Sequence, residues 1–193
     1  RNDFILIDLS GKTLVPGVMD MHVHLSGDAD DNFLEAQNDS IPRQTVKAVK
    51  NANKTLMAGF TTVRDLGASG YSVIATRDGI NAGDIVGPRI WAVGHAISVT
   101  GGHCDDNFSA PEKHATAQGV ADGPWAVRAK VRENIKYGAN AIKICATGGV
   151  FSKGTQVGIQ QLSDEEIKAA VDEARMQGMV IAAHAHGTGG ITA

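Results

Sequence analysis

Short apolar runs alternate with helix-like segments along this chain, and that alternation limits the fold more than any other feature. The segments at 41–58 and 125–137 repeat apolar side chains at helical spacing, and a capping box at 163–166 opens another helix. Continuous apolar strands separated by helices indicate a parallel sheet covered by helices. The sequence therefore predicts an α/β fold. The expected strands lie at residues 18–24, 60–65, 89–94, 141–145 and 179–184.

Composition places the chain among globular proteins and argues against several partners. Its 193 residues, 42% hydrophobic and 20% charged, can bury the core of one domain. The net charge of -3 gives no electrostatic reason to bind nucleic acid or an anionic membrane. No apolar run approaches the length of a membrane span, and no signal peptide is visible. Cytoplasmic, periplasmic and secreted locations all stay open.

The segment from Pro16 to His24 carries the first sign of chemistry. We expect residues 18–24 to form a buried strand after a Pro-Gly turn. Side chains alternate along a strand, so His22 and His24 project from the same face. Two imidazoles side by side at the end of a strand form half of a site for a divalent metal.

Other unusual residues, Asp65, Lys143 and His184, fall at or near the C-terminal ends of later predicted strands. Barrel and open α/β enzymes place their sites at these ends. Lys143 lies between two isoleucines, so its amine is either buried with a lowered pKa or reaches solvent from an edge strand. A buried lysine can form a carbamate with CO2, and this carboxylate can bridge two metal ions. His184, taken alone, is more typical of a core histidine than of a ligand.

Together, His22-x-His24, Lys143 and His184 resemble the ligand set of the amidohydrolase superfamily, in its members with two metal ions. The resemblance covers nearly the whole chain. It is closest to the branch that holds imidazolonepropionase-related proteins and Xaa-Pro or Xaa-Arg dipeptidase-like enzymes, including ochratoxin-type amidases. The matching stretches are Gly59 to Asp65, Thr100 to His103, Ile142 to Gly149 and Ala183 to Gly187.

The resemblance implies a TIM-type (β/α)8 barrel. Residues 17–193 would be the N-terminal portion of that barrel, with about five of its eight strands. The chain starts at Arg1 without an initiator methionine, and five strands close no barrel, so we expect it to be truncated at both ends. A later histidine ligand and a proton-shuttling aspartate of the family would then lie beyond Ala193.

A small β-sandwich usually precedes the barrel in this superfamily. Residues 4–9 and 12–16 predict a strand pair around the Ser10-Gly11 turn. The resemblance implies that residues 1–16 are the end of such a sandwich.

The same resemblance assigns metal ligands. His22 and His24 would ligate the more buried of two divalent ions, expected to be Zn²⁺. Lys143, carboxylated by CO2, would bridge both ions and is counted among the catalytic residues. His184 would ligate the second ion.

Two further histidines would contact the substrate. His103 is similar to the catalytic histidine that contacts the substrate carbonyl, although a loop histidine can equally be solvated. His186 stands where relatives often carry a tyrosine that contacts the substrate carboxylate. Because histidine binds an anion only when it is protonated or donating, this difference leaves the specificity open.

Such a site predicts hydrolysis of an amide or peptide bond, in a dipeptide or an N-acyl amino acid, by metal-activated hydroxide. One alternative is hydrolysis of a cyclic, imidazolone-like amide, which Lys143 disfavours because mononuclear ring-opening relatives usually lack it. Another is an inactive scaffold of the dihydropyrimidinase-related kind, which four potential ligands at strand ends disfavour. The expected partners are a small-molecule or dipeptide substrate and other copies of the chain in a homo-oligomer.

Some conspicuous residues have simpler explanations. Arg64 and Asp65 are expected to form a structural ion pair or to anchor a loop, and His95 is expected to lie in or near the core. Cys104 and Cys145 fit no zinc motif, and their separation leaves a disulfide neither excluded nor favoured.

Overall fold

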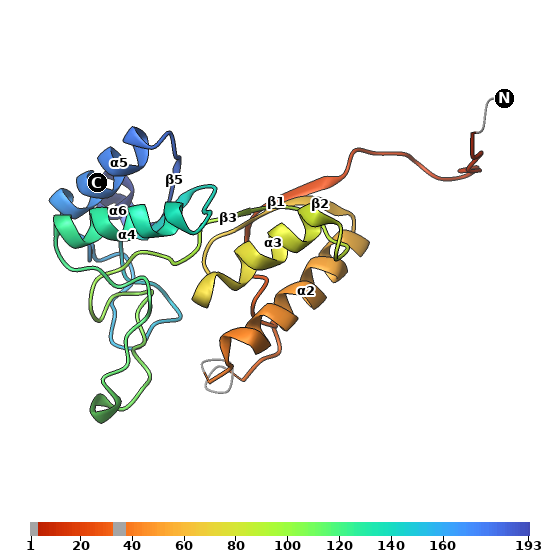
Figure 1. Ribbon diagram of the computed structural model, residues 1–193. Helices are drawn as coiled ribbons and strands as arrows, with labels where there is room; N and C mark the ends of the chain where they lie inside the picture. Colours follow the sequence, from red (N-terminus) through yellow and green to blue (C-terminus); the bar gives the residue numbers. More distant parts are fainter. Residues whose placement is uncertain (1–3, 33–37) are drawn as a thin grey trace.

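The computed structural model describes residues 4–32 and 38–193 (Figure 1). Parallel strands and helices alternate along this part of the chain, which confirms the predicted α/β fold. The strands are β1 (Val18–Val23), β2 (Phe60–Asp65), β3 (Arg89–Ala92), β4 (Ile142–Cys145) and β5 (Ile181–His184). The helices are α2 (Ile41–Met57), α3 (Ser72–Ala82), α4 (Pro124–Lys136), α5 (Asp164–Met176) and α6 (Gly187–Thr192), with short 3-10 turns η1 (Ser69–Tyr71) and η2 (Pro111–Lys113).

The strands form two parallel sheets that Ile97 joins. β1, β2 and β3 pair in that order, and β4 pairs with β5. Beyond the end of β3, Ile97 donates its N–H to the carbonyl of Lys143 and accepts from the N–H of Cys145, at 2.8 Å each. Because all strands run in the same direction, the residues at their C-terminal ends gather at one edge.

The helices cover the strands and build two main cores. α2 and α3 pack over β2 and β3, where Ala52, Val63 and Val73 are buried. α4 and α5 pack together beside β4, where Val131 and Ala170 are fully buried. None of the helices in the described part of the chain combines the length and the apolar character needed to cross a membrane.

Glu166 connects the starts of α4 and α5. In the predicted capping box, its N–H donates to Ser163 Oγ at 3.3 Å, and its Oε2 accepts from the Ser163 N–H at 2.7 Å. Its other oxygen accepts from the N–H of Gly123, the N-cap of α4, at 2.7 Å. One carboxylate therefore satisfies donors at two helix starts, which would otherwise lack partners.

Glu173 joins α4 to α5 through a buried carboxylate that is 1% exposed. Arg132 donates from Nε to Oε1 at 2.6 Å and from Nη2 to Oε2 at 3.0 Å. Arg128 adds a contact at 3.4 Å. These donors, with Arg132 the strongest, lower the pKa of Glu173 below its ordinary value against the opposing effect of burial. The carboxylate therefore remains ionised at neutral pH.

Glu173→Ala should lower the free energy of unfolding by about 1.5–3 kcal/mol, the usual contribution of hydrogen bonds to a charged group. A larger loss is not expected, because Arg132 is 63% exposed and can return to water. A depressed carboxyl pKa stabilises the fold above the unfolded pKa, so this contribution should fade as the pH drops below about 4.5. Urea unfolding from neutral pH to about pH 3 measures both effects.

The control for this prediction is Asp172→Ala, at a neighbouring carboxylate that is 31% exposed. It should cost less than about 1 kcal/mol, because its ion pairs are at the surface. If the deficit of Glu173→Ala were the same at both ends of the pH range, the ion-pair explanation would be wrong.

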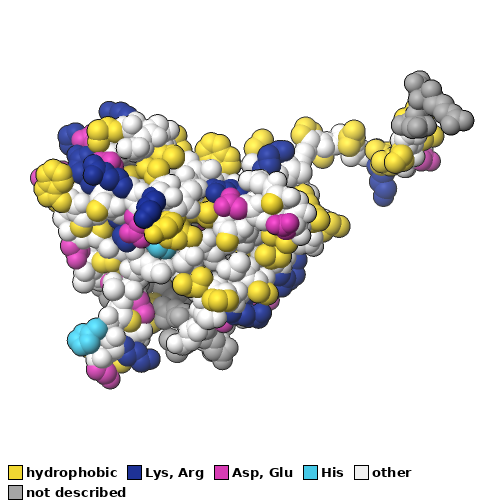
Figure 2. All heavy atoms as spheres, in the orientation of Figure 1, with side chains coloured by type: hydrophobic (Ala, Val, Ile, Leu, Met, Phe, Trp, Pro, Cys, Tyr) yellow, Lys and Arg dark blue, Asp and Glu magenta, His cyan; other side chains and the backbone are white. Residues whose placement is uncertain are grey.

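The predicted N-terminal strand pair is wrong for the described residues. Residues 4–17 form no strand, although the Lys12 N–H donates to the Leu9 carbonyl at 2.9 Å and closes the predicted turn. The segment extends away from the rest of the molecule, with apolar side chains exposed along it (Figures 1 and 2). A two-stranded hairpin is marginally stable without further strands or a helix against its face. That residues 1–16 belong to a β-sandwich stays a prediction, and residues 1–3 lie outside the described part.

β1 is also less buried than predicted. Its residues are exposed or half-buried, and Met19 is 67% exposed. β2 pairs with one edge of β1, whereas no strand of residues 4–32 or 38–193 pairs with the other. An apolar strand is buried only where neighbouring elements cover it, and the residues described here leave β1 partly uncovered.

Candidate active site

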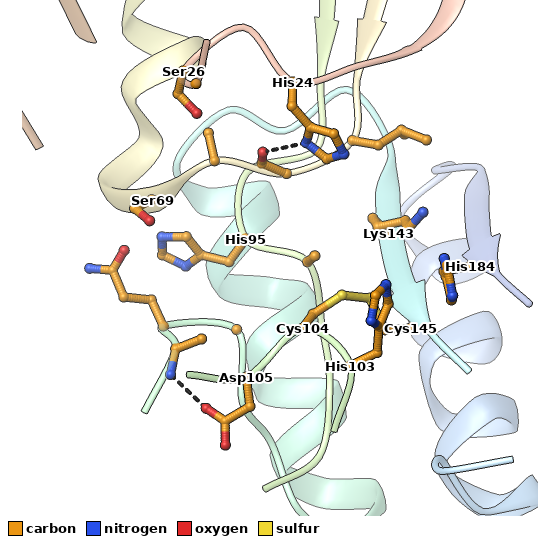
Figure 3. Close-up of a pocket in the computed structure, with 18 of the residues that line it drawn as sticks. His24, Ser26, Ser69, His95, His103, Cys104, Asp105, Lys143, Cys145 and His184 are labelled. Atoms are coloured by element: carbon orange, nitrogen blue, oxygen red, sulfur yellow. Dashed lines mark hydrogen bonds between the residues drawn. A yellow bond between two sulfur atoms is a disulfide. The ribbon is translucent and has the colours of Figure 1, made fainter. Parts of the chain in front are cut away.

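A cavity of about 950 Å³ opens at the C-terminal ends of the strands. Four of the residues around it, His24, His103, Lys143 and His184, surround the same space in Figure 3. His24 directly follows β1, His103 lies in the loop after β3, and Lys143 and His184 lie in β4 and β5, so they are far apart in the sequence. All six residues with predicted roles line this cavity, namely His22, His24, His103, Lys143, His184 and His186. The structure thus brings them together, while the role of each stays a prediction.

His22 lies in β1 and His24 directly follows it, and a backbone carbonyl orients the ring of His24. The ring centroids of His22 and His24 lie 5.4 Å apart. Nδ1 of His24 lies 3.0 Å from the carbonyl oxygen of Gly67. A carbonyl oxygen can only accept, so Nδ1 carries the proton and Nε2 keeps its lone pair. Desolvation, followed by the nearby charge of Lys143, lowers the pKa of His22 and favours its neutral, ligating form.

Asp65 anchors the two loops that hold His24. Its carboxylate is 1% exposed and accepts from the N–H of Leu25 at 2.7 Å and from the N–H of Gly67 at 3.1 Å. Burial raises its pKa to about 6, although both N–H donors and His24 act in the opposite direction. Arg64 instead donates from Nε to the carbonyl of Met21 at 2.8 Å. Of the two expectations for this pair, the loop anchor is confirmed and the ion pair is not.

Lys143 lies in the interior of the sheet, in β4 between Ile97 and β5. The residue is only 4% exposed, so it does not reach solvent from an edge strand. Burial, assisted by the positive charge of Arg64, lowers its pKa to about 8. A substantial fraction of its amine is therefore neutral near physiological pH, and a neutral amine is the form that reacts with CO2.

Three histidine rings pack together beside Lys143. The His184 ring lies 4.1 Å from that of His103 and 4.8 Å from that of His186, measured between centroids. Nε2 of His184 is buried and has no hydrogen-bond partner among the described residues. Burial first, and then the charges of its neighbours, lower the pKa of His184 to about 4. This ring is therefore neutral and keeps one buried nitrogen without a partner in the described part of the chain.

His103 is held in place from three directions. Its N–H donates to Gln161 Oε1 at 2.9 Å, and its Nδ1 lies 2.9 Å from Ser152 Oγ. The next residue, Cys104, forms a disulfide with Cys145 at the end of β4, with the two Cα atoms 6.3 Å apart. His103 is half-buried, so it is not the freely solvated loop residue of the alternative interpretation.

Sequence reasoning missed Gly67, Ser152 and Gln161, which orient the ligating and substrate-contacting histidines. Ser152 and Gln161 lie in a segment without strand or helix periodicity, so no pattern marks them. Gly67 was detectable in principle, because it follows a strand end and adopts φ +146°, which few other residues tolerate.

The histidines at this site carry ring nitrogens of the kind that bind divalent ions. His24 offers a free Nε2, and His184 an unpartnered buried one. No group of three or more His, Cys, Asp or Glu side chains in the described ranges is arranged to hold a metal. A carboxylate on Lys143 would add oxygen donors beside these histidines.

The class of protein that the fold and the site indicate is identified by a match to a known family. Residues 13–193 match the profile of the amidohydrolase family. The chain therefore belongs to the amidohydrolase family, and the resemblance seen in its motifs is confirmed.

Similar proteins include enzymes whose names give their substrates. Ochratoxinase from Aspergillus niger is 33% identical over 198 residues, covering 93% of this chain and 40% of that protein. A solved Xaa-Pro dipeptidase with methionine bound in its active site is 41% identical, with a TM-score of 0.81, covering 92% of this chain and 45% of the other. Another solved amidohydrolase is 36% identical, with a TM-score of 0.84, and the match covers 99% of this chain and 48% of the other. The chain thus spans less than half the length of these relatives.

Proposed function

We propose that the protein containing this chain is a metal-dependent hydrolase that cleaves an amide or peptide bond in a dipeptide or an N-acyl amino acid. The observation that carries the proposal is the gathering of His22, His24, Lys143 and His184 around one cavity at the ends of β1, β4 and β5. The similarity to an ochratoxinase and a Xaa-Pro dipeptidase supports it.

The proposed scaffold is a TIM-type (β/α)8 barrel. The five parallel strands, joined through Ile97, would be consecutive strands of its wall, and residues 17–193 its N-terminal portion. We also propose that residues 1–16 are the end of a small β-sandwich. Its missing strands would cover the apolar side chains exposed along this segment.

In this proposal, His22 and His24 would hold one Zn²⁺ ion, His184 would hold the second, and carboxylated Lys143 would be a ligand of both. The bridge forms when the neutral amine of Lys143 attacks CO2, an N–C bond forms and the nitrogen loses a proton. Two such ions, when bound, polarise a carbonyl and lower the pKa of water. Burial of Lys143 favours the reaction, because it lowers the pKa of the competing ammonium.

The residues of this chain would then position the substrate. His103, with Ser152 Oγ 2.9 Å from its Nδ1, would contact the substrate carbonyl oxygen. Burial, followed by the charges of Lys143 and His186, lowers the pKa of His103 and keeps its ring neutral for this task. His186, whose N–H donates to Thr147 Oγ1 at 3.0 Å, would contact the substrate carboxylate.

Metal removal tests the proposal. The purified full-length protein is stripped with a chelator, then supplied with Zn²⁺ and bicarbonate, and assayed on dipeptides, N-acyl amino acids and a cyclic imidazolone. We expect stripping to lower hydrolysis of the first two substrate classes by about 10²–10³-fold or more, since an electrostatic stabiliser of the transition state is lost, and re-supply to restore it.

The outcomes separate the alternatives. Activity on the cyclic amide alone would favour the ring-opening hydrolase. A protein that binds no zinc and cleaves no amide would match the inactive scaffold. His114→Asn, at an exposed residue of the long loop after β3 that does not line the cavity, is the control variant and should behave as the wild type in every assay.

A further inference from the structure

The disulfide between Cys104 and Cys145 lies in the wall of the cavity, where the proposed chemistry does not use it. Both cysteines line the cavity, as do the predicted ligands and His103 (Figure 3). Cys104 is half-buried, whereas Cys145 is fully buried. A small molecule that enters the cavity would therefore reach the bond from the side of Cys104.

The bond joins two segments that carry proposed catalytic groups. Cys104 directly follows His103 in the loop after β3. Cys145 ends β4 two residues after Lys143, and the alternation of side chains along a strand places both on the same side of β4. Cys145 is also the register partner of His184 in β5. One covalent bond thus links His103 to the strand pair that carries two of the predicted metal ligands.

The end of β4 keeps its place without the disulfide. The Cys145 N–H donates to the Ile97 carbonyl at 2.8 Å, and the next N–H, that of Ala146, donates to the His184 carbonyl at 2.9 Å. These backbone hydrogen bonds belong to the parallel sheet. Breaking the S–S bond should therefore leave the strands, and the ligands that they carry, where they are.

The loop on the other side of the bond is held less firmly. The Cys104 N–H lies 3.4 Å from Ser98 Oγ, at the long limit of a hydrogen bond. His103 contacts Gln161 Oε1 through its N–H and Ser152 Oγ through Nδ1, at 2.9 Å each. Gln161 and Ser152 are both partly exposed, so water can replace these contacts at little cost. Without the disulfide, we expect His103 to leave its place beside β4.

We propose that this disulfide is a redox site that regulates the hydrolase: the oxidised chain holds His103 at the reaction centre, and reduction by a dithiol releases it. The inference rests on the proposed amide hydrolysis and adds its regulation. The protein would be active where disulfides persist and would lose activity in a reducing compartment.

The reduction is a thiol–disulfide exchange in two steps. A thiolate of the dithiol attacks Sγ of Cys104 and forms a mixed disulfide, and Cys145 leaves as a thiolate that takes up a proton. The second thiol of the reductant, as its thiolate, then attacks the reductant's own sulfur in the mixed disulfide, and Cys104 leaves. The products are two cysteine thiols and a cyclic, oxidised reductant. An external disulfide reverses the exchange.

The test compares the oxidised and reduced forms of the zinc-loaded full-length protein. The protein is equilibrated in buffers of reduced and oxidised dithiothreitol with zinc in excess, and alkylation followed by mass spectrometry counts the free thiols. As the two thiols appear, kcat on a dipeptide should fall by about tenfold or more while KM changes less, because a group that acts in the transition state is displaced. Reoxidation should restore kcat.

Two variants and the metal content serve as controls. The double variant Cys104→Ser/Cys145→Ser should show the low kcat of the reduced wild type in every buffer. Lys168→Ala, at an exposed residue of α5, should respond to the buffers as the wild type does. Elemental analysis should find the same zinc content in both redox forms. A disulfide with a structural role alone would lower the melting temperature on reduction and leave kcat unchanged, and that result would overturn the inference.

Hydrogen exchange followed by mass spectrometry tests the same site without any hydrolysis. On reduction, peptides from residues 99–110 should exchange faster, whereas those of β4 and β5 should keep their protection. If no amide is cleaved but this change occurs, the proposed function fails and the redox site stands. Equal exchange of residues 99–110 in the two forms would show that reduction releases nothing, and the inference would be wrong.

Discussion

Lys143→Ala should lower turnover by more than about 100-fold and remove at least one metal ion per chain. Loss of a residue that only supports a metal ligand typically lowers activity by about 10–100-fold, and Lys143 is itself a proposed ligand. The substitution removes the amine from which the proposed carboxylate bridge would form. Added bicarbonate should not rescue the variant, since no amine is left to react with CO2.

Three measurements check this result. Elemental analysis counts the metal, steady-state kinetics gives the turnover, and ¹³C NMR after equilibration with labelled bicarbonate shows the carbamate in the wild type alone. Lys143→Met keeps the buried chain length and separates loss of chemistry from loss of packing. Lys168→Ala, at a lysine that is 73% exposed on α5, is the control. Full metal occupancy with near-native turnover in Lys143→Met would refute the bridging role.

Asp65→Ala should lower the free energy of unfolding by about 2–5 kcal/mol, because two buried backbone N–H groups lose their acceptor. Those groups belong to Leu25, which directly follows His24, and to Gly67, whose carbonyl orients the His24 ring. The same change should therefore weaken zinc binding by about 10–100-fold, the usual effect of losing an outer-shell partner.

Asp65→Asn separates these effects. The amide keeps one acceptor oxygen, so the variant should be more stable than Asp65→Ala while still binding zinc less tightly than the wild type. Chemical unfolding of the metal-free protein and competition with a zinc-binding dye measure the two quantities. If zinc affinity were unchanged in a destabilised Asp65→Ala variant, Asp65 would support the fold without positioning the metal ligand.

The sequence predicted the order of the elements and which residues share the cavity. Both follow from local patterns: apolar periodicity marks strands and helices, and parallel strands bring their C-terminal residues to one edge. Lys143 shows how far this reasoning extends. Its place between two isoleucines limited it to burial or an edge strand, and only the contact with Ile97 on one side and β5 on the other decided between them.

The features that escaped prediction depend on contacts between distant residues. The side chain of Asn134 bonds the backbone N–H and carbonyl of His95, and the carboxylate of Asp65 accepts from the N–H of Leu25. Each contact joins separate elements through a single side chain, and no periodicity encodes such pairs. The prediction of two N-terminal strands was wrong for a related reason. Residues 4–9 and 12–16 have strand-like composition, but a strand requires a partner, and local composition does not show whether one is present.

The disulfide between Cys104 and Cys145 has a consequence for the long loop after β3. This loop could sample many conformations, and each would carry the neighbouring His103 to a different place. The covalent tether confines His103 to a small volume beside β4, where its proposed partner, the substrate carbonyl, would bind. Changes in the length or sequence of the rest of the loop should therefore leave His103 in place beside β4.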